Sequence, residues 1–424
     1  MTRLNIFVLG LDELNQESLE ALPGAEDYRF LPLLSVDELI ESGQVNLSQL
    51  LDKAQRQLDE FDGSVDAIIG YWDFPVSSMV PILCRARGLA GPSLEGVVKC
   101  EHKYWSRVEQ HKVIEEHPRF AIVDLDQDHD VPADLRFPMW LKPVKSASSD
   151  LAFHVEDREQ FAEAVEEIRE GIDRLGKPFE FVLDQIDLPP EIADVGGRAC
   201  LAEEEVDGRQ VTIEGYCYDG EARPYAIIDS VTYPDSPSFL RFQYPSTVPE
   251  EVAQKLVDVS RRVIDQIGLR WGTFNIEYFW DPDSGDICLL EVNPRHSQSH
   301  AVLFQYVDGV TNHHFMVQLA LGQEPEFPHQ GGEYDVAAKW FLRRFEDGVV
   351  RRIPTEEEVE RVEQEIPGVK IDIVPEEGTR LSDMDYQDSY SYELADIHIG
   401  AADESELKAK FEQCAEALRF EFDD

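Results

Sequence analysis

The stretch Phe274 to His300 reads FNIEYFWDPDSGDICLLEVNPRHSQSH, and it decides how the rest of the chain is interpreted. The runs Thr273–Phe279 and Ile287–Val292 have the apolar and aromatic composition of strands. Turn-forming residues lie between them, from Asp281 to Gly285. This pattern predicts a β-hairpin.

Polar side chains recur on both predicted strands at the spacing that places them on one face. Asn275 and Glu277 share a face of the first strand, and Glu291 and Asn293 share a face of the second, because strand side chains alternate with a period of two. A hairpin could therefore gather Glu277, Glu291 and Asn293 into the hard-oxygen set that Mg²⁺ prefers when it also holds triphosphate oxygens. Arg295 could stabilise a phosphoryl group in transfer. The alternative is a solvated hairpin end, which two glutamates alone would favour in an acidic chain.

The whole stretch resembles the metal-binding core of the ATP-grasp superfamily, where a strand Glu, a second Glu, an Asn and an Arg recur in this order. The resemblance spans roughly Leu94 to Gly322, with a looser match before it. It implies an α/β (α+β) fold class and an ATP-grasp fold. It also implies ATP and Mg²⁺ as cofactors, with Mn²⁺ as the alternative metal. Glu277, Glu291 and Asn293 would ligate the metal, and the catalytic Arg295 would lie near the transferred phosphate.

Three further residues match the phosphate-binding parts of that superfamily. Lys103 in EHKYWSR resembles the lysine that opens the core, and Lys142 in MWLKPV resembles a lid lysine that contacts ATP phosphates. Either lysine could instead be an ordinary surface residue. The segment Ser146–Asp150, SASSD, stands where many relatives have a glycine-rich loop. Ser148 is the expected phosphate contact there, through hydroxyl and backbone N–H groups.

The segment LAEEEVDG, residues 201–208, resembles the hinge of the superfamily. The resemblance implies that adenine is recognised near Glu204, Glu205 and Val206. Gln210 stands close to the position where relatives often carry an acidic ribose contact, and the resemblance implies that it lies in the nucleotide site. The alternative is a solvated acidic turn.

The resemblance implies an ATP-dependent ligase that phosphorylates a carboxylate and couples the acyl phosphate to an amine, releasing ADP and phosphate. A biotin carboxylase-like enzyme is an alternative, but Ser299 stands where that enzyme has a glutamate, and its Arg-Arg-His-Gln-Lys stretch is missing between Tyr233 and Pro249. The serines of NPRHSQSH are similar to the carbamoyl phosphate synthetase core, which needs two tandem halves. A non-catalytic ATP-binding sensor also stays open.

Other residues are candidates for the substrate side of the phosphates. Arg241 in SFLRFQYPS is the second expected catalytic residue. His296 and His300 could join it, although histidines more often have a structural role.

The chain divides into three predicted units. Residues 1–93 would form a Rossmann-like domain without a GxGxxG motif, so no dinucleotide site is expected there. Residues 94–332 would form the ATP-grasp domain, with a lid at about 139–205. Residues 333–424 would form a small α+β cap or dimerisation domain, which would make a homodimer.

Local patterns give further expectations for the second unit. A helical stretch is predicted from Gly96 to His117. The strands Met139–Pro143, Leu151–Val155, one around Cys200, and Val211–Tyr218 are predicted to form a small antiparallel lid.

Composition restricts the partners and the environment. The 424 residues include 86 Asp and Glu against 38 Lys and Arg, a formal net charge of -48. This surplus favours a halophilic origin over an ordinary acidic protein, and it argues against nucleic acid or anionic membranes as partners. Six cysteines without a CxxC pair, and no long apolar run, favour a soluble cytoplasmic protein. Small-molecule carboxylate and amine substrates are the expected partners.

The charge surplus leads to a test with salt. We expect the melting temperature to rise steadily from about 0.1 M to beyond about 1 M KCl, because the Debye length falls from about 10 Å to about 3 Å and screens the repulsion. Thermal unfolding followed by circular dichroism measures this. A flat profile would refute the halophilic interpretation.

Overall fold

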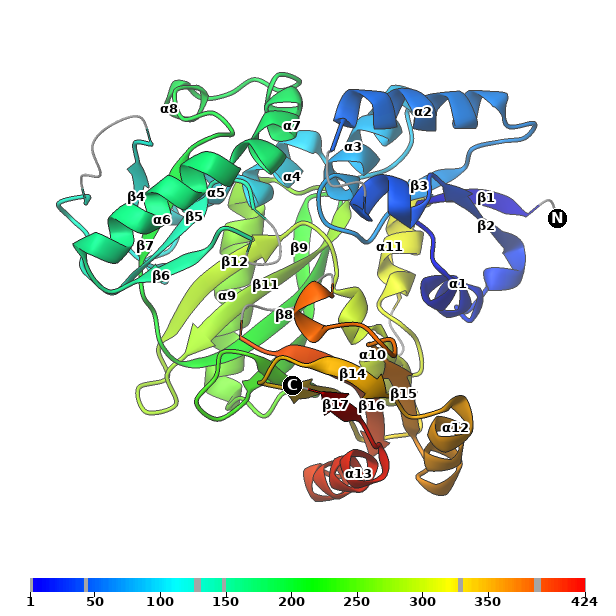
Figure 1. Ribbon diagram of the computed structural model, residues 1–424. Helices are drawn as coiled ribbons and strands as arrows, with labels where there is room; N and C mark the ends of the chain where they lie inside the picture. The colour runs from blue at the N-terminus through cyan, green and yellow to red at the C-terminus, as the bar shows by residue number, and fades with distance from the viewer. Residues whose placement is uncertain are drawn as a thin grey trace.

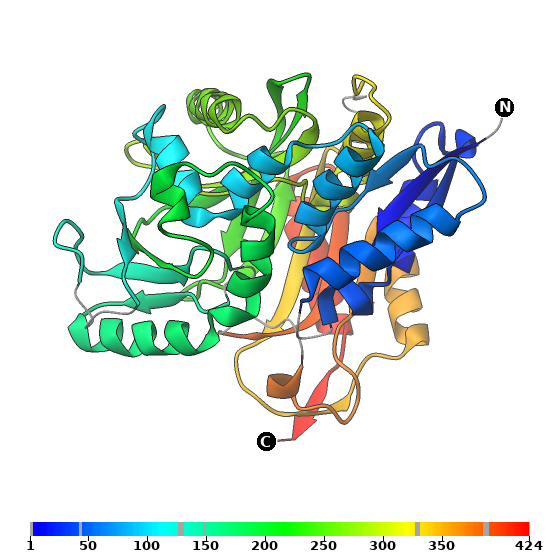
Figure 2. The same cartoon turned by 90° about the horizontal axis from the view of Figure 1, so that it is seen from above.

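The structure is a computed structural model that describes residues 3–41, 45–125, 131–146, 150–326, 331–384 and 390–423. Figure 1 shows an N-terminal sheet on the right and a small sheet on the left, with a large central sheet between them. Figure 2 shows the same separation from above. Among the described residues, no helix is long and apolar enough to cross a membrane. The predicted phosphate contact Ser148 lies outside the described residues.

The N-terminal unit is a parallel three-stranded sheet in the order β2-β1-β3. Its strands are β1 (Leu4–Leu9), β2 (Tyr28–Leu33) and β3 (Ala67–Ile69). Alternate residues of β1 face opposite cores, because strand side chains alternate: Phe7 packs toward α2 (Leu47–Glu60) and α3 (Val76–Arg87), and Val8 toward α1 (Glu13–Glu20) and α11 (His313–Ala320).

The small sheet on the left of Figure 1 is the predicted lid, and it is antiparallel in the order β4-β7-β5-β6. Its strands are β4 (Phe120–Val123), β5 (Met139–Pro143), β6 (Phe153–Val155) and β7 (Cys200–Glu204). Helix α6 (Arg158–Gly171) covers one face through Phe161, Val165 and Ile168. Helices α7 (Asp173–Leu183) and α8 (Pro190–Ala193) follow.

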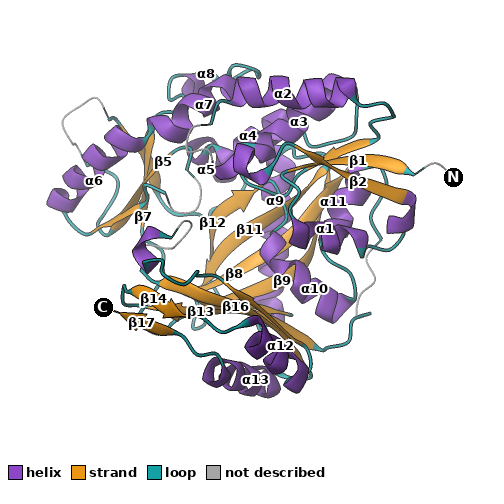
Figure 3. Cartoon of the chain, turned by 45° about the vertical axis from the view of Figure 1, so that its right-hand side comes forward, coloured by secondary structure: helices purple, strands orange, loops and turns teal. Residues whose placement is uncertain are grey.

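The central sheet has eight antiparallel strands in the order β12-β11-β8-β9-β10-β13-β16-β15 (Figure 3). They are β8 (Arg209–Tyr218), β9 (Glu221–Thr232), β10 (Phe239–Tyr244), β11 (Gly272–Trp280), β12 (Ile287–Asn293), β13 (Val336–Arg344), β15 (Val369–Ile373) and β16 (Tyr392–Ala401). Helices α9 (Glu250–Ile267) and α13 (Glu404–Ala417) pack on one face. Helices α10 (Ala301–Asp308) and α11 pack on the other.

Two expectations about the sheets are corrected. The strand predicted at Val211–Tyr218 is β8, and it belongs to the central sheet and not to the lid. The lid strand β4 had not been predicted. The strands β13, β15 and β16 from the last part of the chain extend the central sheet, beside a two-stranded ribbon of β14 (Val349–Arg352) and β17 (Glu421–Asp423) and helix α12 (Glu356–Glu365). The division into three domains stays a prediction.

The helical stretch predicted from Gly96 to His117 is also corrected, because it is interrupted. Helix α4 (Leu94–Glu101) ends and α5 (Lys103–His111) begins on either side of His102. The backbone of His102 is extended, and its ring accepts a hydrogen bond from the Trp105 N–H as the N-cap of α5. Helix α5 contacts β12 through Lys103, which binds Glu291, and through Arg107, which donates to β12 carbonyls.

Candidate active site

The predicted hairpin is confirmed, and it brings the candidate metal ligands together. Strands β11 and β12 pair with Glu277 opposite Glu291 and Asn275 opposite Asn293. The Asn293 amide donates to Asn275 Oδ1 at 3.0 Å and to Glu277 Oε1 at 3.4 Å. A register irregularity follows directly after Glu277. The three predicted ligands therefore share one face at one end of the hairpin.

The carboxylates of Glu277 and Glu291 lie opposite each other and repel, and their surroundings shift the pKa of each. Burial and the neighbouring Glu291 raise the pKa of Glu277 to about 7, although Arg295 and Lys103 oppose the rise. Burial also disfavours ionised Glu291, but Lys103 and Lys142 outweigh burial and lower its pKa. The Lys103 ammonium contacts the Glu291 carboxylate directly. The pair thus lies where added positive charge is favourable.

The second predicted lysine, Lys142, is held by a carboxylate that had not been singled out from the sequence. Lys142 Nζ lies 2.5 Å from Glu203 Oε2, and Arg107 binds the other oxygen of the same group. Burial opposes ionisation of Glu203, but Arg107 and Lys142 lower its pKa to about 2. Arg107 also donates to the carbonyls of Leu289 and Leu290 on β12, at 3.0 and 2.6 Å. Glu203 therefore links the lid to α5 and to the hairpin.

Arg295 is fixed by a second carboxylate that the sequence did not reveal, Asp73. The Arg295 Nε and Nη2 groups donate to the two Asp73 oxygens at 2.7 Å each. Asp73 follows β3. Burial opposes its ionisation, but the charge and hydrogen bonds of Arg295, together with Lys145 and Lys103, lower its pKa. The Asn275 amide donates to the Arg295 carbonyl at 3.1 Å, which ties the arginine to the hairpin. The N-terminal sheet thus contributes to the position of Arg295.

The predicted hinge connects two different sheets. Strand β7 ends at Glu204 in the lid, and β8 begins in the central sheet, so Glu205 and Val206 lie in the connection between them. Gln210, at the start of β8, donates to Glu277 Oε2 at 3.0 Å. A link between the lid and the hairpin face is therefore present, and the adenine-binding roles stay predictions.

The structure does not bring Arg241 to this cluster. Its guanidinium donates to Gln243 and to Glu404 of α13, both at 3.0 Å, and lies 4.7 Å from the Trp340 ring. The adjacent Phe242 packs on the opposite face of the sheet, toward α10. Arg241 is therefore on the α13 face, and the expectation that it faces the phosphates does not fit its position.

His296 and His300 form buried hydrogen bonds under the loop that carries Arg295. His296 Nδ1 lies 3.2 Å from Thr273 Oγ1, and His300 Nδ1 lies 2.8 Å from Glu214 Oε1. Burial lowers the pKa of His296 well below its usual value, so its ring is neutral. Glu214 Oε1 also accepts from the Ser297 N–H at 3.0 Å. These contacts support a structural role for both histidines, and Glu214 had not been predicted from the sequence.

The donor set can be tested against the metal it would hold. Among the described residues there is no group of three or more His, Cys, Asp or Glu side chains arranged to hold a metal ion. Two carboxylates and one amide at the hairpin end match Mg²⁺ shared with a triphosphate, because such sites take further ligands from phosphates and water. Burial and the neighbouring Glu291 raise the pKa of Glu277, and a cation bound beside it would lower that pKa. The residues therefore fit a metal that arrives with nucleotide.

Comparisons with known sequences agree with this geometry. Residues 135–301 match the ATP-grasp domain family. An uncharacterised protein, y4rH, of Sinorhizobium fredii is 26% identical over 265 residues, which cover 61% of this chain and 49% of that protein. The carbamoyl phosphate synthase large chain of Thermotoga maritima is 38% identical over 56 residues, 13% of this chain and 5% of that one. This chain thus spans about half of the length of y4rH.

Solved structures show the same fold over the whole chain. The L-amino acid ligase of Bacillus licheniformis has a TM-score of 0.72 at 17% identity, covering 100% of both chains. Biotin carboxylase of Campylobacter jejuni has a TM-score of 0.68 at 13% identity, and the match covers 99% of this chain and 92% of that one. N5-carboxyaminoimidazole synthase of Aspergillus clavatus has a TM-score of 0.66 at 13% identity, and the match covers 98% of both chains. At these identities the likeness shows the fold alone. The chain therefore has the ATP-grasp fold, and its residues 135–301 match the ATP-grasp domain family.

Proposed function

We propose that the protein is an ATP-dependent ligase that phosphorylates a carboxylate and couples the acyl phosphate to an amine, releasing ADP and phosphate. The observation that carries the proposal is the convergence of Glu277, Glu291 and Asn293 with Lys103 and Arg295 at one end of the hairpin. An ATP-grasp domain and the fold of several ligases support it.

The proposed metal ligands and lysines exchange partners when nucleotide binds. Glu277, Glu291 and Asn293 would hold Mg²⁺, or Mn²⁺ as the alternative. The bound metal would neutralise triphosphate charge and polarise the transferred phosphoryl group. Lys103 now contacts Glu291, and Lys142 contacts Glu203. A triphosphate between these groups would take over the two ammonium groups, since phosphate oxygens are strong acceptors for lysine.

The reaction would take place beside Arg295. One carboxylate oxygen of the substrate attacks the γ-phosphorus, the bond to the β–γ bridging oxygen breaks, and ADP leaves. The amine then attacks the acyl carbon, phosphate leaves with the bonding electrons, and the nitrogen loses a proton. The role of Arg295 is to stabilise the negative charge on the transferred group, and Asp73 fixes the orientation of the guanidinium.

We infer that the substrates are small molecules and that the protein forms a homodimer. Structures with this fold include an L-amino acid ligase and an N5-carboxyaminoimidazole synthase, which supports small-molecule carboxylate and amine substrates. One structure with this fold is described as a biotin carboxylase domain dimer, which is consistent with the predicted homodimer.

Metal binding should depend on pH through Glu277. Because its pKa is raised to about 7, the carboxyl is mainly protonated below that pH and must lose a proton before it can ligate a cation. We expect Mg²⁺ affinity in the presence of ATP to increase about tenfold per pH unit below about pH 7 and to level off above about pH 8. Isothermal titration calorimetry at a series of pH values measures it.

The variant Glu277→Gln is the matched control for that titration. It keeps the shape of the side chain and removes the titrating group, so Mg²⁺ affinity should be weak and nearly independent of pH. Between the ordinary carboxyl pKa and about pH 7, Glu277 is protonated in the folded protein and ionised in the unfolded protein. The free energy of unfolding of the metal-free protein should therefore fall as the pH rises through that range. A Mg²⁺ affinity that is constant from about pH 6 to about pH 8 in the unsubstituted protein would remove Glu277 from the metal site.

Removal of the second carboxylate should abolish turnover and preserve the fold. Glu291→Ala deletes a partly exposed hard-oxygen ligand and leaves the core intact, so Mg²⁺-dependent ADP release should stop while the melting temperature changes little. Glu221→Ala, on the exposed start of β9, is the control and should retain full activity. Near-normal ADP release by Glu291→Ala would disprove the metal assignment.

Lys142 should contribute chiefly to nucleotide affinity. Lys142→Ala removes a charge-assisted phosphate contact, so ATP binding should weaken by about 1.5 to 3 kcal/mol. Calorimetric titration with ATP and Mg²⁺ gives the value, and the exposed Lys177→Ala provides the comparison. Equal ATP affinities for Lys142→Ala and the unsubstituted protein would exclude Lys142 from the nucleotide site.

A further inference from the structure

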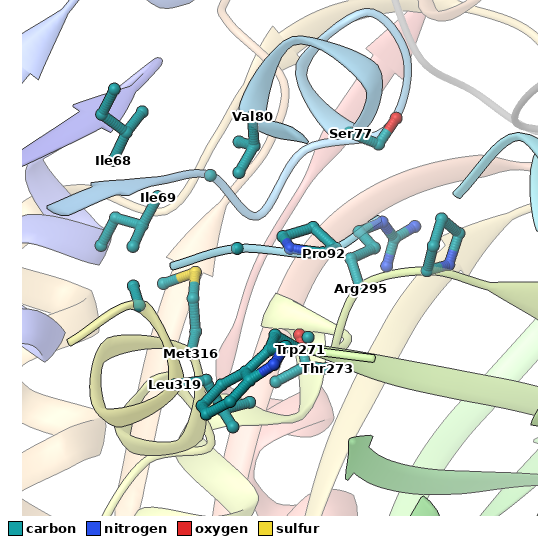
Figure 4. A pocket seen from close by; sticks show the side chains of 15 residues that line it. Ile68, Ile69, Ser77, Val80, Pro92, Trp271, Thr273, Arg295, Met316 and Leu319 are labelled. Carbon is teal, nitrogen blue, oxygen red and sulfur yellow. The ribbon is translucent and has the colours of Figure 1, made fainter. Parts of the chain in front are cut away.

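A small cavity of about 50 Å³ lies where the N-terminal sheet, the start of β11 and helix α11 meet. Figure 4 shows Ile69 and Val80 of the N-terminal unit on one side and Trp271, Met316 and Leu319 on the other. Four of these side chains are at least nine-tenths buried. The walls are therefore mainly apolar, and a cavity of this kind favours an apolar occupant over water.

Arg295 contributes a charged group to the lining of this cavity. A guanidinium has five N–H groups. Three of them form hydrogen bonds, two to the carboxylate of Asp73 and one to the carbonyl of His296 at 3.2 Å. The other two have no hydrogen-bond partner within the part of the chain that the structure describes. They are donors available to a carboxylate beside the cavity.

The cavity lies next to the proposed phosphoryl-transfer site. Thr273 lines it and belongs to the same face of β11 as Asn275 and Glu277. Arg295 lines it as well and follows the proposed ligand Asn293 by two residues. A carboxylate bound by Arg295 could therefore extend toward the metal on one side and place its apolar part in the cavity on the other.

Gly272 lies at the edge of the cavity, and a side chain there would point toward Pro92 and Leu269, on the face of β11 opposite Thr273. A Cβ atom on Gly272 would lie 3.2 Å from the Pro92 Cβ, and both residues line the cavity. Gly272 does not have the positive φ that would itself demand glycine. A side chain at position 272 would therefore reduce the space between the β11 start and the segment before α4.

We propose that this cavity binds the apolar side chain of the carboxylate substrate, while the free N–H groups of Arg295 bind its carboxylate. This inference rests on the proposed ligase function. The cavity exceeds the space needed for one water, and its lining is mainly apolar. The substrate class is therefore an aliphatic acid, including amino acids with an aliphatic side chain, and Leu319 limits the size of that side chain.

The test compares carboxylic acids of about two to eight carbons, straight and branched, with their α-amino derivatives, using hydroxylamine as the nucleophile. ADP release and hydroxamate formation give kcat/KM for each acid. Leu319→Ala enlarges the cavity and should raise the ratio of longer to shorter acids by about tenfold or more per added methylene.

Leu256→Ala is the matched control, because Leu256 is a fully buried leucine of α9 outside the cavity lining. It should lower stability without changing the acid preference. Leu319→Val serves if Leu319→Ala does not fold, and it should give a smaller shift in the same direction.

If Leu319→Ala or Leu319→Val turns over with an unchanged acid preference, the cavity is a packing void. That result would overturn the cavity proposal while the ligase proposal stands. The absence of ADP release with every acid in the unsubstituted protein would instead overturn the ligase proposal and this inference with it.

Discussion

The repulsion between Glu277 and Glu291, opposite each other on two paired strands, is the constraint on which the rest of the site depends. Like charges directly opposite each other in a sheet destabilise it, and burial adds to the penalty. Two features reduce this repulsion. The pKa of Glu277 rises to about 7, which favours its protonated, neutral form, and the ammonium group of Lys103 contacts Glu291. A cation bound between the two carboxylates would lower this repulsion, which is the electrostatic basis of the proposed metal site.

The groups that surround this pair come from parts of the chain that are far apart in sequence. Lys103 begins α5, Lys142 lies on a lid strand, and Arg295 follows β12 and is oriented by Asp73 from the N-terminal unit. Glu203 joins two of these parts by binding both Lys142 and Arg107. The positive charges needed by a triphosphate are thus assembled only when the lid, the central sheet and the N-terminal sheet are together. This explains why a site for phosphoryl transfer would occur at their junction.

The hairpin and its four polar residues could be predicted because the whole pattern is local: two strands, a short turn and a period of two. Partners distant in sequence could not be found in this way. Glu203 appeared as one of three consecutive glutamates, and Asp73 and Glu214 carried no local signal. Pattern alone also does not tell which sheet a strand joins, so β8 was assigned to the lid. Arg241 was expected on the substrate side of the phosphates, but strand alternation puts it on the α13 face. The break at His102 depends on a side-chain cap that the helical pattern conceals.

The central claim is that these residues transfer a phosphoryl group from ATP to a carboxylate. The most direct measurement uses an acid that stimulates ADP release, labelled with oxygen-18 in its carboxyl group, followed by mass analysis of the inorganic phosphate. An acyl phosphate keeps the bridging oxygen with phosphorus when the amine attacks carbon, so one labelled oxygen per turnover should appear in phosphate. If ADP release and product formation proceed at equal rates but the phosphate contains no oxygen-18, the account is contradicted.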